Sequence, residues 1–235
     1  MVRETKRGLE HLKAILTSAL KKPTAIIFDM DGVLVDSEPL HKRAKEMALQ
    51  EVGIQLPASF YDSYKGRPDR TVFHEGLAGK VPDAEIPRLM ERKHQLFEQL
   101  EPELQPVPGA VEFVRWASTP FRLALATSAT PRDRAAVLRM LKVEDCFESI
   151  VDTARFERAK PDPQIFHVAM RDLGLSVADC WIIEDSLAGV RAAKASGSFT
   201  VAITTTFDAA ALRDCGADMV IDSFEELRKL LEQSR

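Results

Sequence analysis

Residues 25–34 read AIIFDMDGVL, and this stretch decides the fold. Its first four residues are apolar without alternation and follow Pro23, which is typical of a buried parallel strand. Asp29 and Asp31 come next, with Gly32 after them. Because buried carboxylates are costly without a partner, the pair predicts a divalent-metal site with Asp29 as nucleophile and Asp31 as its acid/base partner. The alternative for the same residues is an Asx turn that closes on Gly32.

The composition indicates an ordinary globular chain. It has 235 residues, of which 45% are hydrophobic and 29% charged. The formal net charge of -4 gives no overall basic surface, so we expect neither nucleic acid nor a membrane as partner. The apolar runs are too short to span a bilayer, and the first residues show no apolar core of a signal peptide.

Three cysteines, Cys146, Cys180 and Cys215, are widely spaced and form no CxxC pair. This spacing is typical of a reducing compartment and predicts a cytoplasmic location. We expect the three thiols to serve as small, partly buried hydrophobic groups.

The rest of the chain divides by its periodicity. Residues 1–22 have apolar residues at close to helical spacing, which predicts one amphipathic helix ending before Pro23. Residues 35–105 show helical periodicity and no convincing strand, so we interpret them as an inserted helical domain. Residues 23–34 and 106–235 alternate strands with helices, which predicts an α/β core with a doubly wound, mostly parallel sheet.

The expected elements can be placed approximately. In the helical domain, we expect a helix that begins at Ser37 as its cap, one that contains Val72 and Phe73, and one over 83–100. In the core, the expected strands after the first are 121–126, 149–151, 181–183, 200–203 and 219–221. The expected core helices are 109–118, 131–141, 161–173, 186–196, 208–214 and 224–233.

Three further polar motifs are predicted to share one sheet edge with the first aspartate pair. They are Thr127-Ser128, Lys160-Pro161 and Glu184-Asp185. Because the strand ends of a parallel sheet open on one edge, we expect these side chains to converge. Taken singly, each has a plain alternative: a helix cap, a solvated lysine and a surface turn.

The combined set suits phosphoryl transfer. A carboxylate that attacks phosphorus forms an acyl phosphate, but its charge repels the phosphate dianion, so a hard cation must neutralise both. Asp29 and Asp185 offer the oxygen ligands that Mg²⁺ prefers. Lys160 and the Thr127 hydroxyl would hold phosphate oxygens. Asp31 would protonate the leaving alkoxide and then activate the incoming water or hydroxyl.

From residue 23 onward the chain resembles the haloacid dehalogenase superfamily of phosphotransferases. The motifs that carry the resemblance are DxDGVLVDSE at 29–38, TS at 127–128, KPDP at 160–163 and EDSxxG at 184–189. The resemblance implies a Rossmann-like core with a helical cap inserted after the first motif. It also implies Mg²⁺ at Asp29, the Asp31 backbone and Asp185, with Glu184 next to the metal and acting through water. Aspartate at position 31 resembles the phosphatase and mutase branches rather than the dehalogenases.

Within the superfamily, the chain is most similar to the β-phosphoglucomutase-like subfamily. His41 and Lys65-Gly66 stand where that subfamily has a histidine and a lysine-glycine pair in its cap. Together with Arg67 they are candidates for substrate binding; the alternatives are a helix-surface histidine and a solvent-facing basic turn. The loop continues Arg67-Pro68-Asp69, and Arg132 stands near the position of a mutase lysine. These departures favour hydrolysis.

The predicted function is therefore a Mg²⁺-dependent phosphatase that acts on a small phosphorylated metabolite, a sugar phosphate or related monoester, through an aspartyl-phosphate intermediate. A hexose phosphomutase of the β-phosphoglucomutase type is the alternative. A non-catalytic protein that binds phosphate ligands or a partner is the third, although a binding module has no need of the aspartate pair. The identity of the ester and the oligomeric state are open.

Overall fold

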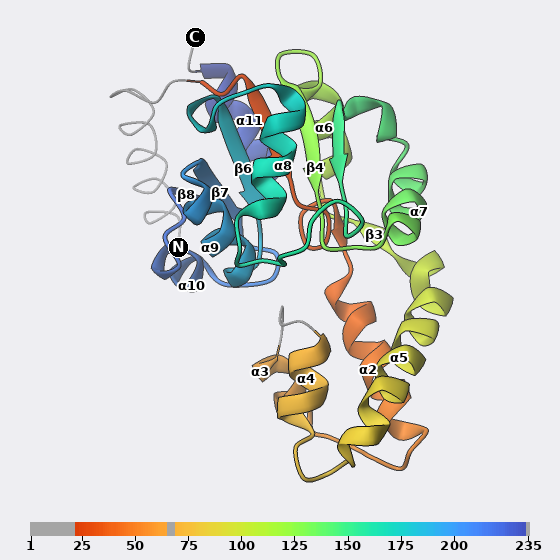
Figure 1. Cartoon of the computed structure of the whole chain (residues 1–235). Coiled ribbons are helices and arrows are strands. Elements are labelled where there is room, and N and C mark those ends of the chain that lie inside the picture. Colours follow the sequence, from red (N-terminus) through yellow and green to blue (C-terminus); the bar gives the residue numbers. More distant parts are fainter. Residues whose placement is uncertain (1–21, 65–68, 234–235) are drawn as a thin grey trace, which may run out of the picture. The chain divides into compact units, whose positions relative to one another are not determined.

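The computed structural model describes residues 22–64 and 69–233 (Figure 1). They form two compact units. The first unit comprises the described residues up to Leu34 and those from Pro106 onward, and the second is Val35–Gln105. The helix predicted over residues 1–22 falls outside the described residues except for its last residue. Among the described helices, none has the length and apolar character needed to span a membrane.

The first unit is built on a six-stranded parallel sheet. Its strands are β1 (Ala25–Phe28), β4 (Arg122–Ala126), β5 (Ser149–Val151), β6 (Cys180–Glu184), β7 (Phe199–Ile203) and β8 (Met219–Ile221). They lie side by side in the order β5-β4-β1-β6-β7-β8. Counted along the chain, this is the 3-2-1-4-5-6 order of doubly wound folds. The predicted fold class is therefore confirmed.

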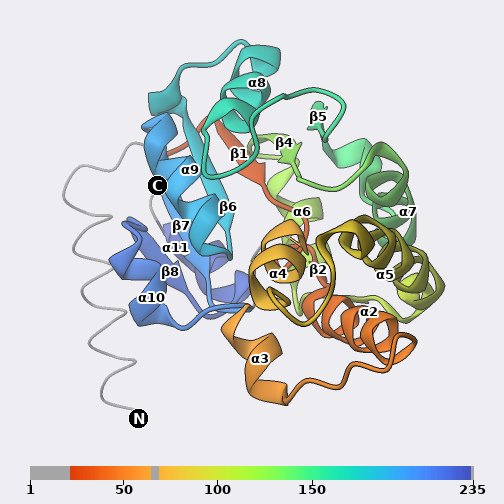
Figure 2. The ribbon, with the colours of Figure 1, turned by 60° about the horizontal axis from the view of Figure 1, so that its bottom comes forward.

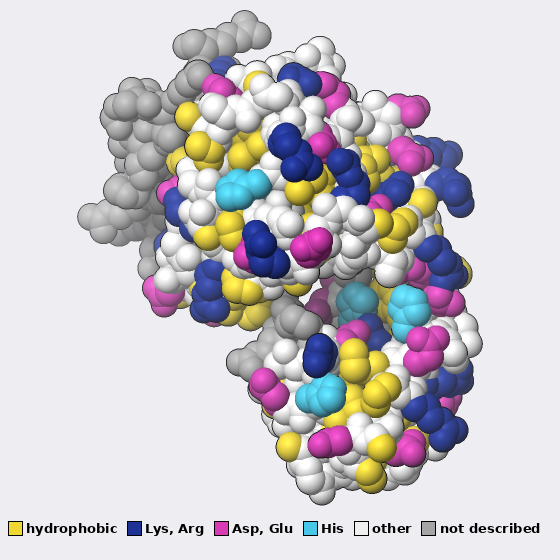
Figure 3. All heavy atoms as spheres, in the orientation of Figure 1, with side chains coloured by type: hydrophobic (Ala, Val, Ile, Leu, Met, Phe, Trp, Pro, Cys, Tyr) yellow, Lys and Arg dark blue, Asp and Glu magenta, His cyan; other side chains and the backbone are white. Residues whose placement is uncertain are grey.

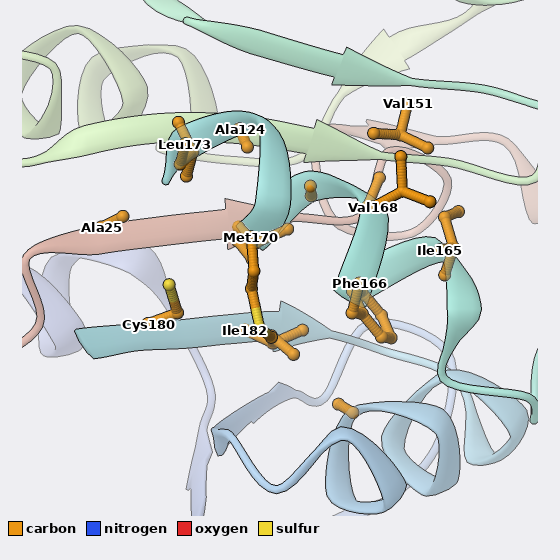
Figure 4. Close-up of a cluster of buried hydrophobic side chains, with 14 of the residues drawn as sticks. Ala25, Ala124, Val151, Ile165, Phe166, Val168, Met170, Leu173, Cys180 and Ile182 are labelled. Carbon is orange, nitrogen blue, oxygen red and sulfur yellow. The ribbon is translucent and has the colours of Figure 1, made fainter. Parts of the chain in front are cut away.

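Helices cover both faces of this sheet (Figure 2). They are α6 (Ala110–Ala117), α7 (Pro131–Leu141), α8 (Gln164–Leu173), α9 (Leu187–Ser196), α10 (Ala209–Asp214) and α11 (Phe224–Gln233). On one face, α8 and α9 bury an apolar cluster in which Phe166 and Met170 lie over the strands (Figure 4). On the other face, the ring of Phe113 in α6 contacts those of Phe28 and Phe224, with centroids 6.0 and 5.0 Å apart. Burial on both faces explains why the strands have no polar alternation.

Several of these helices begin with side-chain caps, one of them α10, where the Asp208 carboxylate accepts a hydrogen bond from the Ala211 N–H at 2.9 Å. The Thr130 hydroxyl accepts a hydrogen bond from the Asp133 N–H at 3.2 Å and begins α7. The Ser186 hydroxyl accepts one from the Gly189 N–H at 3.0 Å and begins α9. The alternative interpretation of Thr127-Ser128 as a helix cap is therefore wrong, because Thr130 fills that role.

The second unit is helical. It contains α2 (Glu38–Gln50), α3 (Ala58–Ser63), α4 (Asp69–Gly76) and α5 (Ile86–Leu100), with a short 3₁₀ turn, η1 (Asp83–Glu85), before α5. Its own core is a cluster of Leu49, Tyr61, Phe73, Leu77, Val81, Ile86 and Leu89. The short α3 was not expected, because six residues are too few to show a periodicity. Ser37 is the N-cap residue of α2, as expected, although its side chain makes no capping hydrogen bond.

A two-stranded sheet joins the two ends of this segment. Its strands are β2 (Val35–Asp36) and β3 (Gln105–Pro106). The expectation that residues 35–105 contain no strand is wrong here. Two-residue strands carry no sequence pattern, because alternation needs at least four residues to be visible.

The face of the molecule shown in Figure 3 carries Lys and Arg side chains intermixed with Asp and Glu. This mixture agrees with the small formal net charge of the chain. The absence of a nucleic-acid partner stays a prediction.

Candidate active site

The ends of β1 and β6 place two acidic motifs side by side. In the parallel register, Phe28 is opposite Ile183, and the Asp29 N–H donates to the Ile183 carbonyl at 3.0 Å. Asp29 therefore lies beside Glu184, which ends β6, with Asp185 next in the chain. These are the first and fourth strands of the 3-2-1-4-5-6 order, where successive connections run to opposite sides. Ligands of doubly wound sheets bind in the crevice at this switch point.

Lys160 links the two acidic motifs. Its Nζ donates to Asp29 Oδ1 at 2.7 Å and to Glu184 Oε1 at 2.6 Å. It also donates to the carbonyl of Ala126, the last residue of β4, at 3.3 Å. Burial lowers the pKa of Lys160, but the carboxylates of Asp29 and Glu184 outweigh that effect and raise it above its usual value. The ammonium group is therefore permanently charged.

One lysine does not balance the negative charge around it. Carboxylate oxygens of Asp29, Glu184 and Asp185 lie within 4.8 Å of one another, and all three residues are buried. Burial, together with the charges of Glu184 and Asp31, outweighs the pull of Lys160 and raises the pKa of Asp29 to about 7. Burial, Glu184 and Asp29 likewise raise the pKa of Asp185 well above its usual value. A cluster of oxygen donors with excess negative charge fits a hard divalent cation.

Glu184 is the most tightly held of the three carboxylates. Its Oε1 accepts from Lys160, and its Oε2 accepts from the N–H groups of Asp185 and Ser186 at 3.1 and 3.3 Å. The Ser186 hydroxyl donates to the same oxygen at 3.2 Å. The carboxyl also lies against Gly189, where an added Cβ would come within 2.0 Å of it. The glycine of the EDSxxG motif is thus required by the position of Glu184.

The other predicted core residues adjoin this cluster. Thr127 follows β4 and is fully buried; its N–H donates to the Val151 carbonyl at 2.9 Å and its hydroxyl accepts from the Ala129 N–H at 3.0 Å. Ser128 is exposed. Asp31 lies in the turn after β1, close enough for its charge to raise the pKa of Asp29. The structure thus brings Asp29, Lys160, Glu184 and Asp185 together, with the Thr127 and Asp31 turns at the same strand ends.

His41 belongs to a separate polar cluster inside the second unit. Lys93 Nζ donates to His41 Nδ1 at 2.9 Å and to Asp69 Oδ2 at 2.7 Å. Lys45 Nζ lies 3.3 Å from Asp69 Oδ1. The two lysine side chains are almost fully buried, at 7% and 4% exposure for Lys45 and Lys93. The His41 ring stacks on Phe97 with centroids 4.1 Å apart.

The charges of this cluster are well defined. Burial, followed by the charge of Lys93, lowers the pKa of His41 well below its usual value, so the ring is neutral at pH 7. Because Lys93 donates to Nδ1, the ring proton is on Nε2. Burial raises the pKa of Asp69, but Lys93 and Lys45 outweigh burial and hold it below its usual value. Two ammonium groups therefore share one carboxylate. The other candidates of this unit, Lys65, Gly66 and Arg67, lie outside the described residues.

Lys45, Lys93 and Asp152 were missed from the sequence. A signal for Lys93 exists, because it stands within the apolar stripe of α5 formed by Ile86, Leu89, Leu96, Phe97 and Leu100. A lysine on such a stripe has to find a buried partner. Asp152 follows β5, is buried, and accepts from Arg134 at 3.1 Å and from the Ala154 N–H at 3.1 Å. Because ligands bind at the carboxyl ends of parallel strands, the position of Asp152 directly after β5 was a signal for it as well.

Comparison with known proteins agrees with the geometry. The family model described as haloacid dehalogenase-like hydrolase matches residues 23–197. The chain belongs to this family. The resemblance drawn from the motifs is therefore confirmed, and with it the prediction of an enzyme of the phosphatase and phosphomutase kind.

Relatives with different printed activities are similar to this chain. The phosphorylated carbohydrates phosphatase of Thermotoga maritima is 33% identical over 218 residues, covering 88% of this chain and 98% of the relative. The beta-phosphoglucomutase of Bacillus subtilis is 32% identical over 188 residues, covering 76% of this chain and 82% of the relative. The chloroplastic protein SUPPRESSOR OF QUENCHING 1 of Arabidopsis thaliana is 35% identical over 219 residues, but this chain spans only 20% of its length. The cytoplasmic location stays a prediction.

Among solved structures, the putative beta-phosphoglucomutase from Thermotoga maritima is similar to this chain with a TM-score of 0.73 and 30% sequence identity. The match covers 88% of this chain and 98% of that one. The similarity extends through both the core and the inserted helical segment, since so little of either chain is left out.

The raised pKa of Asp29 makes the metal-free protein sensitive to pH. Its pKa is about 7 when folded against a usual value of 3.8, so its contribution to stability is complete below pH 3.8 and is lost as the pH rises to about 7. In EDTA, raising the pH from 5 to 8 should lower the melting temperature of the wild type by about 5 °C more than that of Asp29→Asn. Thermal denaturation followed by circular dichroism measures this difference.

The exposed Asp145→Asn is the matched control, and its melting temperature should follow the wild type across the same pH range. Parallel curves for the wild type and Asp29→Asn would show that the Asp29 carboxyl is not desolvated in the folded chain.

Proposed function

We propose that this protein is a Mg²⁺-dependent phosphatase that hydrolyses a small phosphorylated metabolite through a phosphoaspartate at Asp29. The observation that carries the proposal is the buried cluster of Asp29, Glu184 and Asp185, in which Lys160 pairs with Asp29 and Glu184 and leaves an excess of carboxylates. A structural ion pair has no need of this excess, which costs stability. A site that receives both a cation and a phosphate dianion does need it.

The carboxylates of Asp29 and Asp185 and the backbone carbonyl of Asp31 are the proposed Mg²⁺ ligands. Bound there, Mg²⁺ would neutralise the phosphate and the attacking carboxylate together. Glu184 adjoins this set, but both of its oxygens already accept hydrogen bonds within the chain. We therefore assign Glu184 to holding Lys160 and to contact with the metal through water.

The reaction divides into two displacements at phosphorus. In the first, an Asp29 carboxylate oxygen bonds to phosphorus while the bond from phosphorus to the ester oxygen breaks, and Asp31 gives its proton to the leaving alkoxide. In the second, Asp31 takes a proton from water as the water oxygen bonds to phosphorus and the Asp29–phosphorus bond breaks. Inorganic phosphate leaves and both aspartates return to their first state. Lys160 and the Thr127-Ser128 turn are proposed to bind the phosphate oxygens.

The polar cluster of the second unit is proposed to bind the rest of the substrate. Lys93 and Lys45 give it more positive than negative charge, and the neutral His41 ring presents an Nε2–H donor. This chemistry suits hydroxyl groups or a second anionic group, as in sugar phosphates. Lys65, Gly66 and Arg67 precede Asp69 in the chain, and we propose that they contribute to the same recognition.

A phosphomutase uses the same core residues, and the relatives of this chain include a protein named as one. Hydrolysis is favoured because Asp69, which follows Arg67-Pro68, is a carboxylate paired with Lys93 and Lys45. Its pairing reduces the cationic charge available to hold a phosphorylated intermediate in two orientations. The phosphomutase is therefore the second candidate.

A Mg²⁺-dependent screen of sugar phosphates and other small phosphate esters tests the proposal. It should follow inorganic phosphate and, for β-glucose 1-phosphate with a bisphosphate primer, glucose 6-phosphate. We expect phosphate release concentrated on a few esters, lost by about 10³-fold or more in Asp29→Asn and by about 10²-fold or more in Asp31→Asn. The control Asp145→Asn should retain wild-type rates.

Three results would contradict the proposal in different ways. Glucose 6-phosphate formed without matching phosphate release would make the protein a mutase. Phosphate release that Asp29→Asn leaves unchanged would remove Asp29 as nucleophile. Tight binding of esters without turnover would indicate a non-catalytic binding protein.

The second-unit cluster has its own prediction. Lys93→Met should raise the KM of the best substrate about tenfold or more, with a smaller change in kcat, because the cluster loses the charge that holds His41 and Asp69 in place. Arg88→Met, at an 85% exposed side chain of the same helix, is the control and should leave KM unchanged. Equal KM values for Lys93→Met and the wild type would show that the cluster is structural only.

A further inference from the structure

The loop after β7 supplies a part of the sheet edge that the proposed reaction does not use. It reads Thr204-Thr205-Thr206, directly after Ile203. In the parallel register of β6 and β7, Ala202 is opposite Glu184, so the loop continues beside Asp185. Thr204 anchors the loop at its start, since its N–H donates to the Ile221 carbonyl at 3.1 Å and its hydroxyl to Asp222 at 2.8 Å.

Two hydroxyl groups of this loop reach the candidate active site. The Thr205 hydroxyl donates to the carbonyl of Gly32, 173 positions earlier in the chain. The Thr206 hydroxyl hydrogen-bonds the Asp185 side chain and acts to lower the pKa of that carboxyl, opposing burial. A threonine hydroxyl has this effect when it donates to the ionised form. The loop therefore contacts both the turn after β1 and the end of β6.

The backbone of Gly32 confines the Asp185 carboxylate from another side. Gly32 has φ +72°, and a Cβ built on it would lie 1.8 Å from Asp185 Oδ2 and 3.0 Å from Thr206 Oγ1. Asp185 and Thr206 thus both lie against the open side of Gly32. The glycine is required here for its conformation and for the space that the carboxylate takes.

Different groups hydrogen-bond the three carboxylates. Lys160 serves Asp29 and Glu184 at 2.7 and 2.6 Å. Asp185 has a hydrogen bond from Thr206, whose Oγ1 lies on the same side of Gly32 as Asp185 Oδ2. A second lysine in this place would compete with a bound cation, whereas a neutral hydroxyl orients the carboxylate without adding charge.

We propose that Thr206 is a positioning residue that holds the Asp185 carboxylate in one orientation for a divalent cation, and that Thr205 holds the Gly32 turn in place for it. This inference rests on the proposed function, because it takes Asp185 as a metal ligand. Residues that hydrogen-bond metal ligands typically set metal affinity by about 10- to 100-fold. The threonine loop therefore determines how tightly the site binds its cation.

Calorimetric titration of the metal-free protein with Mn²⁺ tests the inference without any substrate. Mn²⁺ is a suitable probe because it prefers the same oxygen ligands as Mg²⁺. Thr206→Val keeps the shape of the side chain but has no donor, and it should weaken Mn²⁺ binding by about tenfold or more. Thr206→Ser keeps the donor and should bind within about twofold of the wild type. Thr206→Ala serves if the valine variant does not fold.

Thr200→Val is the matched control. Thr200 is a buried threonine of β7, the strand that leads into this loop, at the end away from Asp185, and its hydroxyl donates to the Ser198 carbonyl. Mn²⁺ affinity should be unchanged in this variant. Wild-type affinity in Thr206→Val or Thr206→Ala, with loss of binding in Asp185→Asn, would overturn the role of Thr206 alone. If the wild type bound no Mn²⁺, or if Asp185→Asn bound like the wild type, the metal site of the proposed function would fail as well.

Discussion

The fold and its site depend on one electrostatic constraint: three buried carboxylates meet around one buried ammonium group. Lys160 contacts Asp29 and Glu184 directly, and its charge is insufficient for the whole group. A folded chain keeps such a group only where another positive charge or a chemical task compensates for it. Without a bound cation, burial and the neighbouring carboxylates raise the pKa values of Asp29 and Asp185. The proposed phosphatase activity uses the same imbalance, since a cation and a phosphate together complete the charge balance.

The strand order brings the acidic side chains together, and two glycines leave room for them. Strands β1 and β6 are adjacent although the chain makes two other strands of this sheet between them, so the switch point brings Asp29 and Glu184 together. Gly189 leaves room for the Glu184 carboxyl, and Gly32 does the same for Asp185. At both positions a larger residue would collide with an acidic side chain of the site. A substitution of either glycine would therefore change the positions of the charged groups as well as the packing of the backbone.

Much of this arrangement could be predicted from the sequence. Apolar runs followed by polar residues located the strands, and the rule that parallel strands open on one edge predicted that Asp29, Lys160 and Asp185 lie close together, as they do. The helix expected from residue 161 begins at Gln164, and α3 was missed, because element ends and short helices leave little periodic signal. Lys45 and Lys93 were missed because their burial depends on Asp69, a partner that is distant in sequence. The contacts of Thr205 and Thr206 were missed for the same reason.

In the proposed reaction, Asp29 becomes covalently phosphorylated during turnover. The most direct measurement is to quench the wild-type enzyme with acid during turnover of its best ester, reduce it with borohydride and map the product by peptide mass spectrometry. Reduction converts an aspartyl phosphate to homoserine, so the account predicts homoserine at position 29 only when substrate and Mg²⁺ are both present. Modification at another residue, or none at Asp29 while phosphate is being released, would contradict it.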